Sequence, residues 1–443
     1  MKRAALKDLA NWLRNPYRKP LILRGARQVG KSTLVHLFSE DEELDLIEVN
    51  LEVERLSSVE KKEFRLQSLL DEIQLKKNKR ITKNTLLFFD EIQESPMLLK
   101  YLRYFYEKSP ELKVIAAGSL LEVALRAEDF SFPVGRVEFY HLGPMSFQEF
   151  LWATGQNFLD QKLTEWDFSD ELHEAAIDAL KDYYYVGGMP EAVRVFSETQ
   201  SLVRMREIQS QIIQTYQADF PKYNKRINVQ RISRVFNSLA SSLGEKVIFS
   251  KLDSESLSRD IKRVVELLID SRVVLSCHHS DGNSVPLEGE VDSRIFKPYF
   301  IDIGLLNAML RLDVDSIDSE FRNNFNTKGI LAEQFVAQHL NYFQGHSLNP
   351  SLFYHLKDKG TQKAEIDFLV ESEQNIFPIE VKSTAKGHLK SLKSFCERKS
   401  SLIGVKVSLA NFTIDDDFVK DCKLVNIPLY AIDYLKSNLG RIL

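Results

Sequence analysis

The feature that most constrains this chain is a glycine-rich stretch between a short apolar run and a helical pattern. Residues 25–32 read Gly-Ala-Arg-Gln-Val-Gly-Lys-Ser, which fits the phosphate-binding pattern G-x-x-x-x-G-K-[ST]. The apolar residues 21–23 predict a buried strand before it, and a helix is expected from Lys31. In such a loop, backbone amides and a helix N-terminus face phosphate groups. The pattern therefore predicts an α/β domain that binds a nucleoside triphosphate.

The residues of this loop have separate expected tasks. Lys31 is expected to reach the β- and γ-phosphates of ATP, and Ser32 to ligate Mg²⁺. The other residues expected to bind the nucleotide are Gly25, Arg27, Gln28, Val29, Gly30 and Thr33. The alternative is a chance glycine-rich turn, which a second motif makes less attractive.

That second motif is an apolar run, residues 86–89, which ends in Asp90 and Glu91. The run predicts a buried strand with two carboxylates at its C-terminal end. Asp90 is expected to hold Mg²⁺, and Glu91 to orient or deprotonate the attacking water. Alone, the pattern fits an acidic strand end that caps the next helix equally well. Together with the glycine-rich loop it favours hydrolysis.

Two more residues could complete a hydrolytic site. Ser119 follows a predicted strand at 114–117, so it could sense the γ-phosphate, cap the next helix, or do both. Arg136 follows Gly135 in a loop. It could neutralise transition-state charge within its own subunit or across a subunit interface, or it could be an ordinary surface arginine.

The order of strands and helices divides the 443 residues into four expected modules. Residues 1–150 alternate strands and helices, as in a parallel sheet covered on both faces. Residues 151–225 are mostly helical. Residues 226–310 give three helices and then two strands, the order of a winged helix-turn-helix. Residues 325–443 combine a helix with strands expected at 352–356, 364–370, 376–382, 402–407 and 428–432.

The third module carries a local positive charge. The whole chain has a net charge of -4, which argues against binding nucleic acid along its full length. Residues 221–280, however, contain 11 lysines and arginines against 6 acids. Arg259 and Lys262 on the third expected helix could face a major groove. Winged helices also serve as protein contacts and as lids, so that alternative stays open.

Carboxylates and a lysine are expected to meet in the fourth module. The strands 364–370 and 376–382 flank a short polar link, which predicts a hairpin that brings Asp367 to Glu380. Glu380 and Lys382 share one face, because side chains alternate along a strand. Asp367 and Glu380 could bind Mg²⁺, and Lys382 could position or activate a water. The alternative is an exposed hairpin with ordinary neighbouring charges.

These features resemble the AAA+ ATPases, and more closely a bacterial and archaeal family of AAA-type ATPases with a nuclease-like C-terminal domain. The landmarks are residues 25–32, 89–93, 117–119, 135–136, 187–191, 299–305 and 365–368. The resemblance implies an α/β fold with a P-loop AAA+ core, a helical lid, a winged helix-turn-helix and a C-terminal restriction-endonuclease-like α/β domain. It also implies that Pro190 lies near the adenine, because its turn looks like the Gly-x-Pro turn of signalling ATPases; a plain turn between helices is the alternative.

The spacing of the C-terminal charges resembles the PD-(D/E)xK nuclease-like fold, in which an upstream helix supplies another acid. Glu333 is the matching residue on the helix expected from Gly329. Ile366 stands where the pattern has proline before Asp367, which weakens the match. The same fold is also used without cleavage, so the fold alone does not establish activity.

Two functional hypotheses follow. In the first, ATP hydrolysis controls a Mg²⁺-dependent nuclease that acts on nucleic acid, with DNA expected. In the second, the chain is a nucleotide-dependent switch or scaffold whose inactive nuclease-like domain only binds nucleic acid or protein. A homo-oligomer is compatible with either hypothesis. Three widely spaced cysteines and the lack of a long apolar run predict a cytoplasmic protein with neither disulfides nor a membrane span.

Overall fold

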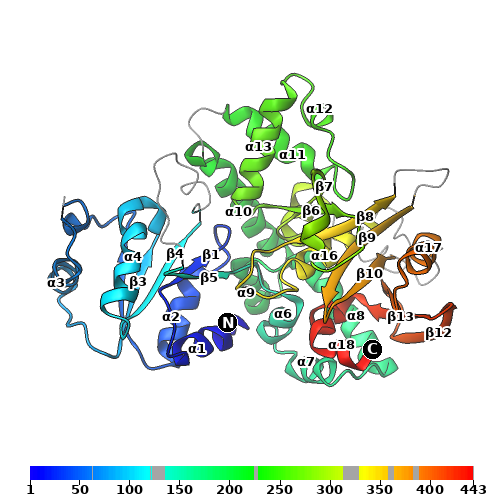
Figure 1. Cartoon of the computed structure of the whole chain (residues 1–443), viewed down its shortest axis with the longest axis horizontal. Coiled ribbons are helices and arrows are strands. Elements are labelled where there is room, and N and C mark those ends of the chain that lie inside the picture. The colour runs from blue at the N-terminus through cyan, green and yellow to red at the C-terminus, as the bar shows by residue number, and fades with distance from the viewer. Residues whose placement is uncertain are drawn as a thin grey trace.

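The computed structural model describes residues 1–61, 63–119, 121, 135–223, 228–312, 329–357, 364–382 and 389–442. Two β-sheets stand at opposite sides of the molecule, with helices of the middle segment between them (Figure 1). The N-terminal part, in blue and cyan, holds one sheet, and the C-terminal part, in yellow to red, holds most of the other.

The N-terminal sheet has five parallel strands in the order β2-β3-β4-β1-β5. Their bounds are β1 Leu21–Arg24, β2 Asp45–Asn50, β3 Thr85–Asp90, β4 Lys113–Gly118 and β5 Glu138–His141. The expected α/β architecture is confirmed, and so are the strands expected at 21–23, 86–89 and 114–117. β5 was not expected, because a four-residue strand with two polar ends has no clear periodicity.

Alternation along these strands builds two cores, one on each face of the sheet. Leu86 and Phe88 of β3 belong to the core beneath α1 (Ala5–Arg14) and α2 (Lys31–Asp41). Leu87 and Phe89 belong to the opposite core, with α3 (Leu66–Lys77) and α4 (Pro96–Lys108). Because both faces are covered, the central strands are apolar throughout, and polar side chains are left to the strand ends.

The middle segment is helical. Five helices follow the first sheet: α6 Phe147–Ala153, α7 Asn157–Thr164, α8 Asp170–Val186, α9 Pro190–Thr199 and α10 Leu202–Tyr223. The next group, α11 Val229–Ala240, α12 Phe249–Leu252 and α13 Ser258–Asp270, lies at the top of Figure 1. The helices α6, α9 and α10 stand between the two sheets in the same view.

The second sheet has eight strands in the order β12-β13-β11-β10-β9-β8-β6-β7. Their bounds are β6 Val274–Ser280, β7 Val291–Phe300, β8 Leu352–Lys357, β9 Ala364–Ser372, β10 Asn375–Val381, β11 Ile403–Ser408, β12 Thr413–Val419 and β13 Cys422–Pro428. The helices of this part are α14 Ile303–Met309, α16 Gly329–Leu340, α17 Lys390–Lys399 and α18 Leu435–Ile442. β9 and β10 form the expected antiparallel hairpin.

The two strands that were expected to form the wing of a winged helix belong to the larger second sheet instead. β6 and β7 pair with each other, but β6 also pairs in parallel with β8, at His278 and Phe353 among other positions. One sheet therefore spans residues that the sequence divides between a winged-helix module and a C-terminal module. The pairing joins residues about 75 positions apart, which no local pattern can indicate.

The strand expected at 428–432 is wrong. Residues 422–428 form β13, and Leu429–Tyr434 form a 3-10 helix instead. Pro428 stands just before this helix, with a φ of -58° that suits a helical start. Five of the six residues in the helix are buried, so the apolar run is explained by packing rather than by a strand.

The three cysteines are free and buried. Within the described ranges, no helix combines the length and the apolar character needed to cross a bilayer.

Candidate functional site

The glycine-rich loop lies where the motif requires, between β1 at the centre of the sheet and α2. Gly30 precedes α2 with a φ of 88°, a left-handed conformation that glycine adopts without strain. A Cβ on Gly25 would stand 2.2 Å from the carbonyl oxygen of Leu142, so this position also requires glycine. The Lys31 ammonium is buried in the loop, where it donates to the carbonyls of Gly25 at 3.0 Å and Ala26 at 2.8 Å.

The two ATPase motifs meet through a direct hydrogen bond. Ser32 donates its hydroxyl to Oδ2 of Asp90 at 2.7 Å. Asp90 ends β3 and Ser32 is the second residue of α2, and both lie at the edge where the parallel strands have their C-terminal ends. A hydroxyl and a carboxylate in contact are the groups that would hold the Mg²⁺ of a bound nucleotide. Thr33 follows on the first turn of α2 and is exposed.

Glu91 is held by a residue that the sequence did not single out. Its φ of 52° is left-handed, and its Oε2 accepts a hydrogen bond from Nε2 of Gln93 at 2.5 Å. Gln93 in turn lies against Gly118 at the end of β4, where a Cβ would stand 2.6 Å from its Oε1. Gln93 thus fixes the Glu91 carboxylate between β3 and β4. The only sequence signal was its place in the landmark 89–93.

Ser119 lies at the edge of the sheet that carries the phosphate loop, whereas Arg136 does not. Ser119 follows β4, beside β3, and its hydroxyl is buried with no hydrogen-bond partner among the described residues. The Ser119 hydroxyl is therefore available to bind a phosphate group at the edge of the sheet where Asp90 lies. Arg136 precedes β5, which runs parallel to β1 and pairs with it from Glu138 to His141. Arg136 therefore lies where the strands have their N-terminal ends, at the edge opposite to that of Asp90. It forms an exposed ion pair with Glu107 at 2.9 Å, and a role in its own subunit's phosphate site does not fit this geometry.

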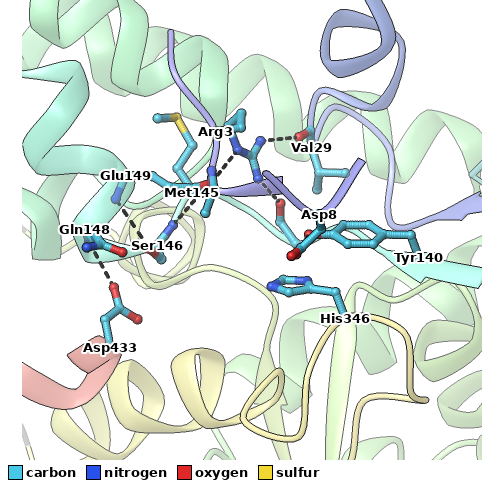
Figure 2. Close-up of polar contacts among 12 residues, drawn as sticks. Arg3, Asp8, Val29, Tyr140, Met145, Ser146, Gln148, Glu149, His346 and Asp433 are labelled. Atoms are coloured by element: carbon cyan, nitrogen blue, oxygen red, sulfur yellow. Dashed lines mark hydrogen bonds and ion pairs between the residues drawn. The ribbon is translucent and has the colours of Figure 1, made fainter. Parts of the chain in front are cut away.

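Arg3 holds the loop from the side of the N-terminal segment (Figure 2). Its buried guanidinium donates to the carbonyl of Val29 at 2.9 Å, to that of Gly143 at 2.9 Å and to Glu149 at 3.0 Å. Glu149 also forms a capping box with Ser146 at the start of α6. The sequence gave no signal for Arg3, because its partners are 26 to 146 residues away.

The helices of the middle segment contact the loop on another side. Tyr216 on α10 donates its hydroxyl to the carbonyl of Arg27 at 2.8 Å, and Arg27 forms an ion pair with Asp219 at 2.7 Å. Pro190, the first residue of α9, lies against Gly30, whose Cβ would stand 3.5 Å from its ring. The structure thus brings Pro190 next to the loop, as a role near the nucleotide requires. Gln28 lies in the same loop with a φ of 63°.

The turn before Pro190 is built on a buried carboxylate from the landmark 299–305. Asp302 accepts hydrogen bonds from the backbone of Gly188 at 2.6 Å and of Leu305 at 2.9 Å. A Cβ on Gly187 would stand 2.3 Å from Oδ1 of Asp302, so glycine is needed there. Burial raises the pKa of Asp302 to about 6, although the backbone donors lower it.

The basic segment exposes part of its charge on α13. Arg259, Lys262 and Arg263 have side chains that are 76%, 59% and 71% exposed, and their ion pairs with Asp260 and Glu266 are 3.8 Å or longer. Arg231 and Arg234 differ, because they contact Asp260 and Asp253 within the segment. The surface that phosphate groups could reach is therefore the outer side of α13.

The C-terminal charges gather on one face of the second sheet. Asp367 on β9 accepts a hydrogen bond from the backbone of Val381 at 2.7 Å, which joins it to β10 beside Glu380. Lys382 donates to Oε1 of Glu380 at 2.6 Å. Glu333 on α16 accepts a hydrogen bond from Tyr299 of β7 at 3.0 Å. The four residues expected to converge do so, although they come from α16, β9, β10 and the position just after β10.

A further lysine belongs to this cluster. Lys297 on β7 is 2% exposed and forms an ion pair with Glu365, two residues before Asp367. It was missed because it lies about 70 residues before the hairpin, in the segment expected as a wing. Its pKa is raised: burial lowers it, but Glu333, Glu365 and Asp367 outweigh that effect.

Burial and mutual repulsion perturb the acids. Burial raises the pKa of Glu333 to about 8 and that of Glu380 to about 7, and the nearby Asp367 raises both. Burial also raises the pKa of Asp367, against the effect of Lys297 and of the Val381 amide. The carboxylates of the cluster therefore carry more negative charge than the nearby lysines and hydrogen-bond donors neutralise.

Two carboxylates of this cluster provide what Mg²⁺ requires of a protein site. Oε2 of Glu380 is buried and has no hydrogen-bond partner in the part of the chain that the structure describes. In the same part of the chain, no three or more His, Cys, Asp or Glu side chains are arranged as a ready metal cage. Mg²⁺ usually takes one or two carboxylates and completes its shell with water and substrate oxygens. Asp367 and Glu380 fit that requirement.

Three family models match separate segments of the chain. Residues 17–151 match an AAA domain. Residues 177–316 match a domain of unknown function (DUF8612), and residues 328–430 match another (DUF4143). No curated protein matches the chain. Residues of the carboxylate cluster come from two of these segments. Lys297 and Tyr299 lie in residues 177–316, and the four acids lie in residues 328–430: Glu333, Glu365, Asp367 and Glu380.

Solved structures include distant likenesses. The Walker-type ATPase of Pyrococcus abyssi is 16% identical, covers 69% of this chain and 94% of its own length, and has a TM-score of 0.45. The RuvB Holliday junction branch migration motor of Thermotoga maritima is 13% identical, covers 62% and 89%, and has a TM-score of 0.30. Both TM-scores are too low for either structure to establish the fold of this chain. The AAA-domain match and the phosphate-loop geometry agree, and residues 17–151 form a P-loop domain similar to the AAA domains.

Proposed function

We propose that this chain binds ATP with Mg²⁺ at the P-loop and hydrolyses it. The observation that carries the proposal is the direct contact of Ser32 with Asp90 at 2.7 Å, beside the buried Lys31. This contact unites the two motifs at one edge of a parallel sheet. Mg²⁺ bound by Ser32 and Asp90 would neutralise charge on the β- and γ-phosphates.

Each neighbouring residue then has a task in the proposed reaction. Lys31 binds the β- and γ-phosphates, and the loop amides cradle them. Glu91, fixed by Gln93, orients or deprotonates the attacking water. Ser119 contacts the γ-phosphate through its buried hydroxyl, and Pro190 packs near the base. Arg136 is assigned to the nucleotide of an adjacent subunit, which requires a homo-oligomer.

Replacement of Lys31 tests the nucleotide site. Lys31→Ala should abolish ATP binding, because it removes the cation that faces the phosphates. Lys7→Ala, an exposed lysine on α1, is the matched control and should bind ATP as the wild type does. Fluorescent ATP titration measures both. An unchanged affinity in Lys31→Ala would reject the site.

For the C-terminal cluster we propose Mg²⁺-dependent cleavage of nucleic acid, with DNA as the substrate and ATP hydrolysis as its control. Asp367 and Glu380 would hold the metal, which would polarise a phosphate and a water. Lys382 would position the water or stabilise developing negative charge, and Glu333 supplies the further acid. The specific support is the buried Oε2 of Glu380 beside Asp367, which has no hydrogen-bond partner among the residues that the structure describes.

Two substitutions separate cleavage from metal binding. Asp367→Ala should abolish both, since a single remaining carboxylate rarely holds Mg²⁺. Lys382→Ala should abolish cleavage but largely keep metal binding, because an ammonium group is not a ligand. Neither change should lower ATP affinity. Asp417→Ala, an exposed acid on β12, is the control. Cleavage of single- and double-stranded DNA and RNA is followed with Mg²⁺ or Mn²⁺, with and without ATP.

The second candidate function is a nucleotide-dependent switch or scaffold. It is favoured by Ile366, which stands where the nuclease pattern has proline before Asp367. A wild type that neither binds Mg²⁺ or Mn²⁺ at the cluster nor cuts any nucleic acid offered would replace the nuclease proposal with this one. The domain would then bind nucleic acid or a protein without changing it covalently.

A further inference from the structure

Lys297 is the most buried charge of the C-terminal cluster, and the proposed chemistry does not use it. Its ammonium group reaches from β7 to Glu365 on β9, past β6 and β8, which lie between them in the sheet. On the way it lies 5.0 Å from the ring centroid of Tyr354. A lysine that is 2% exposed needs charged partners, because a buried, unpaired ammonium is costly.

The face of β7 that carries Lys297 is directed at the cluster as a whole. Tyr299 is two residues further along the strand, so it lies on the same face, and it donates a hydrogen bond to Glu333 at 3.0 Å. Lys382 stands on the other side of the cluster, where it pairs with Glu380 at 2.6 Å. The two ammonium groups are therefore divided between the two sides, and Asp367 lies on β9 between them.

The formal charges do not balance within the cluster. The carboxylates of Glu333, Glu365, Asp367 and Glu380 face the ammonium groups of Lys297 and Lys382. Fully ionised, this set is left with two negative charges, which one divalent cation would neutralise. Without Lys297 the excess would be three. Nucleases with paired metals hold two ions about 3.5–4 Å apart, which needs acidic ligands on both sides.

We infer that Lys297 is a built-in cation that takes the place of a second metal ion, so that the cluster binds a single divalent cation at Asp367 and Glu380. The inference rests on the metal site of the proposed nuclease function. Lys297 neutralises the side of Glu333 and Glu365, which then cannot attract an ion of their own. It acts as a positioning residue, because it touches an acid of the cluster rather than the substrate.

The test is Mn²⁺ binding to the full chain without nucleotide, measured by electron paramagnetic resonance and calorimetry. All proteins carry Ser32→Ala, which removes one of the two metal ligands of the P-loop, and ions that remain there are distinguished by their persistence in Asp367→Asn. The variant is Lys297→Met, which keeps an unbranched side chain of similar length and removes its charge. Lys436→Met, a lysine on α18 outside the cluster, is the matched control. Asp367→Asn, alone and combined with Lys297→Met, identifies ions bound at the cluster.

The parent should bind one Mn²⁺ that Asp367→Asn removes. Lys297→Met should bind a second Mn²⁺, or the first at least about tenfold more tightly, since one repelling charge is gone. Lys436→Met should match the parent. If Lys297→Met keeps the parent's stoichiometry and affinity, or binds more weakly, the inference is overturned. Should the variant be too unstable for titration, its rise in Tm on adding Mn²⁺ gives the same comparison.

A parent that binds no Mn²⁺ would contradict the proposed nuclease metal but would still decide the role of Lys297. If Lys297→Met then gains an Mn²⁺ site that Asp367→Asn abolishes, Lys297 is the cation that occupies the cluster. If Lys297→Met also binds none, both the metal site and the inference fail.

Discussion

Glu91 combines a left-handed backbone with a carboxylate held by Gln93. This setting places the Glu91 carboxylate at the end of β3, beside the Ser32–Asp90 contact. We expect Glu91→Gln to bind ATP with nearly normal affinity, because the shape of the side chain is kept. Turnover should fall by roughly 10²–10⁴, because the base is lost. Single-turnover hydrolysis and ATP titration check the two halves. Normal turnover would move the catalytic role to another residue.

The residues of the phosphate site could be read from the sequence because their spacing is local. Lys31 and Ser32 follow the glycines directly, and Asp90 follows an apolar strand, so short-range patterns identify them. Arg3, Gln93 and Lys297 could not be found in this way. Each takes its role from a partner that only the fold brings near, as Arg3 does with Val29. Arg136 shows the reverse, since a local pattern suggested a role that the strand register does not allow in one subunit.

Among the elements, the turn before α9 depends on the buried Asp302. Its folded-state pKa of about 6 lies above the value near 3.9 of an unfolded chain. A raised carboxyl pKa contributes stability that is complete below about pH 4 and is lost as pH rises through 6. Relative to Asp302→Asn, the wild type should therefore lose about 2 kcal/mol of unfolding free energy between pH 4 and pH 7.

Denaturant unfolding of the two proteins at a series of pH values measures that difference. Above pH 7 it should be constant, because Asp302 is then ionised in both states. Asp178→Asn, an exposed acid on α8, should show no comparable change in this window. A difference between the wild type and Asp302→Asn that is independent of pH would refute the assignment.

The exposed charges of α13 give the test for nucleic acid. Replacing Arg259, Lys262 and Arg263 by glutamate should weaken DNA binding and flatten its dependence on salt. The slope of log affinity against log salt should change by roughly 0.9 for each lost phosphate contact. Fluorescence anisotropy at several salt concentrations measures this. A wild type with no salt-dependent affinity would make the segment a protein contact or a lid.

Elements differ in how well the sequence predicts them, and packing explains why. The apolar strands β1 to β4 are buried on both faces, so each is marked by composition alone. Leu429–Tyr434 is equally apolar but forms a 3-10 helix, so apolar composition alone does not distinguish it from a strand. β6 and β7 were found as strands but given to the wrong sheet, because strand pairing depends on residues that are distant in sequence.

For the molecule as a whole, α6 connects the two sites. Its first turn receives Arg3 from the P-loop side, through Glu149. On the other side, the backbone of Gln148 donates to Asp433 at 2.9 Å (Figure 2). The backbone of Phe147 donates to Nε2 of His339 at 3.1 Å. A cavity of about 200 Å³ lies at this junction. The order of these modules was predictable from the sequence, whereas the contacts between them were not.

The pairing of β6 with β8 has a practical consequence for dividing the chain. A fragment that began after α14 would keep β8 but lose its neighbour, and the hydrogen-bonding groups that meet β6 would face solvent. Exposed strand edges of this kind recruit other chains and promote aggregation. Such a fragment would also lack Lys297, and with it part of the charge balance around Asp367. The smallest piece that can stand for the C-terminal site therefore begins before β6, well upstream of the boundary suggested by composition.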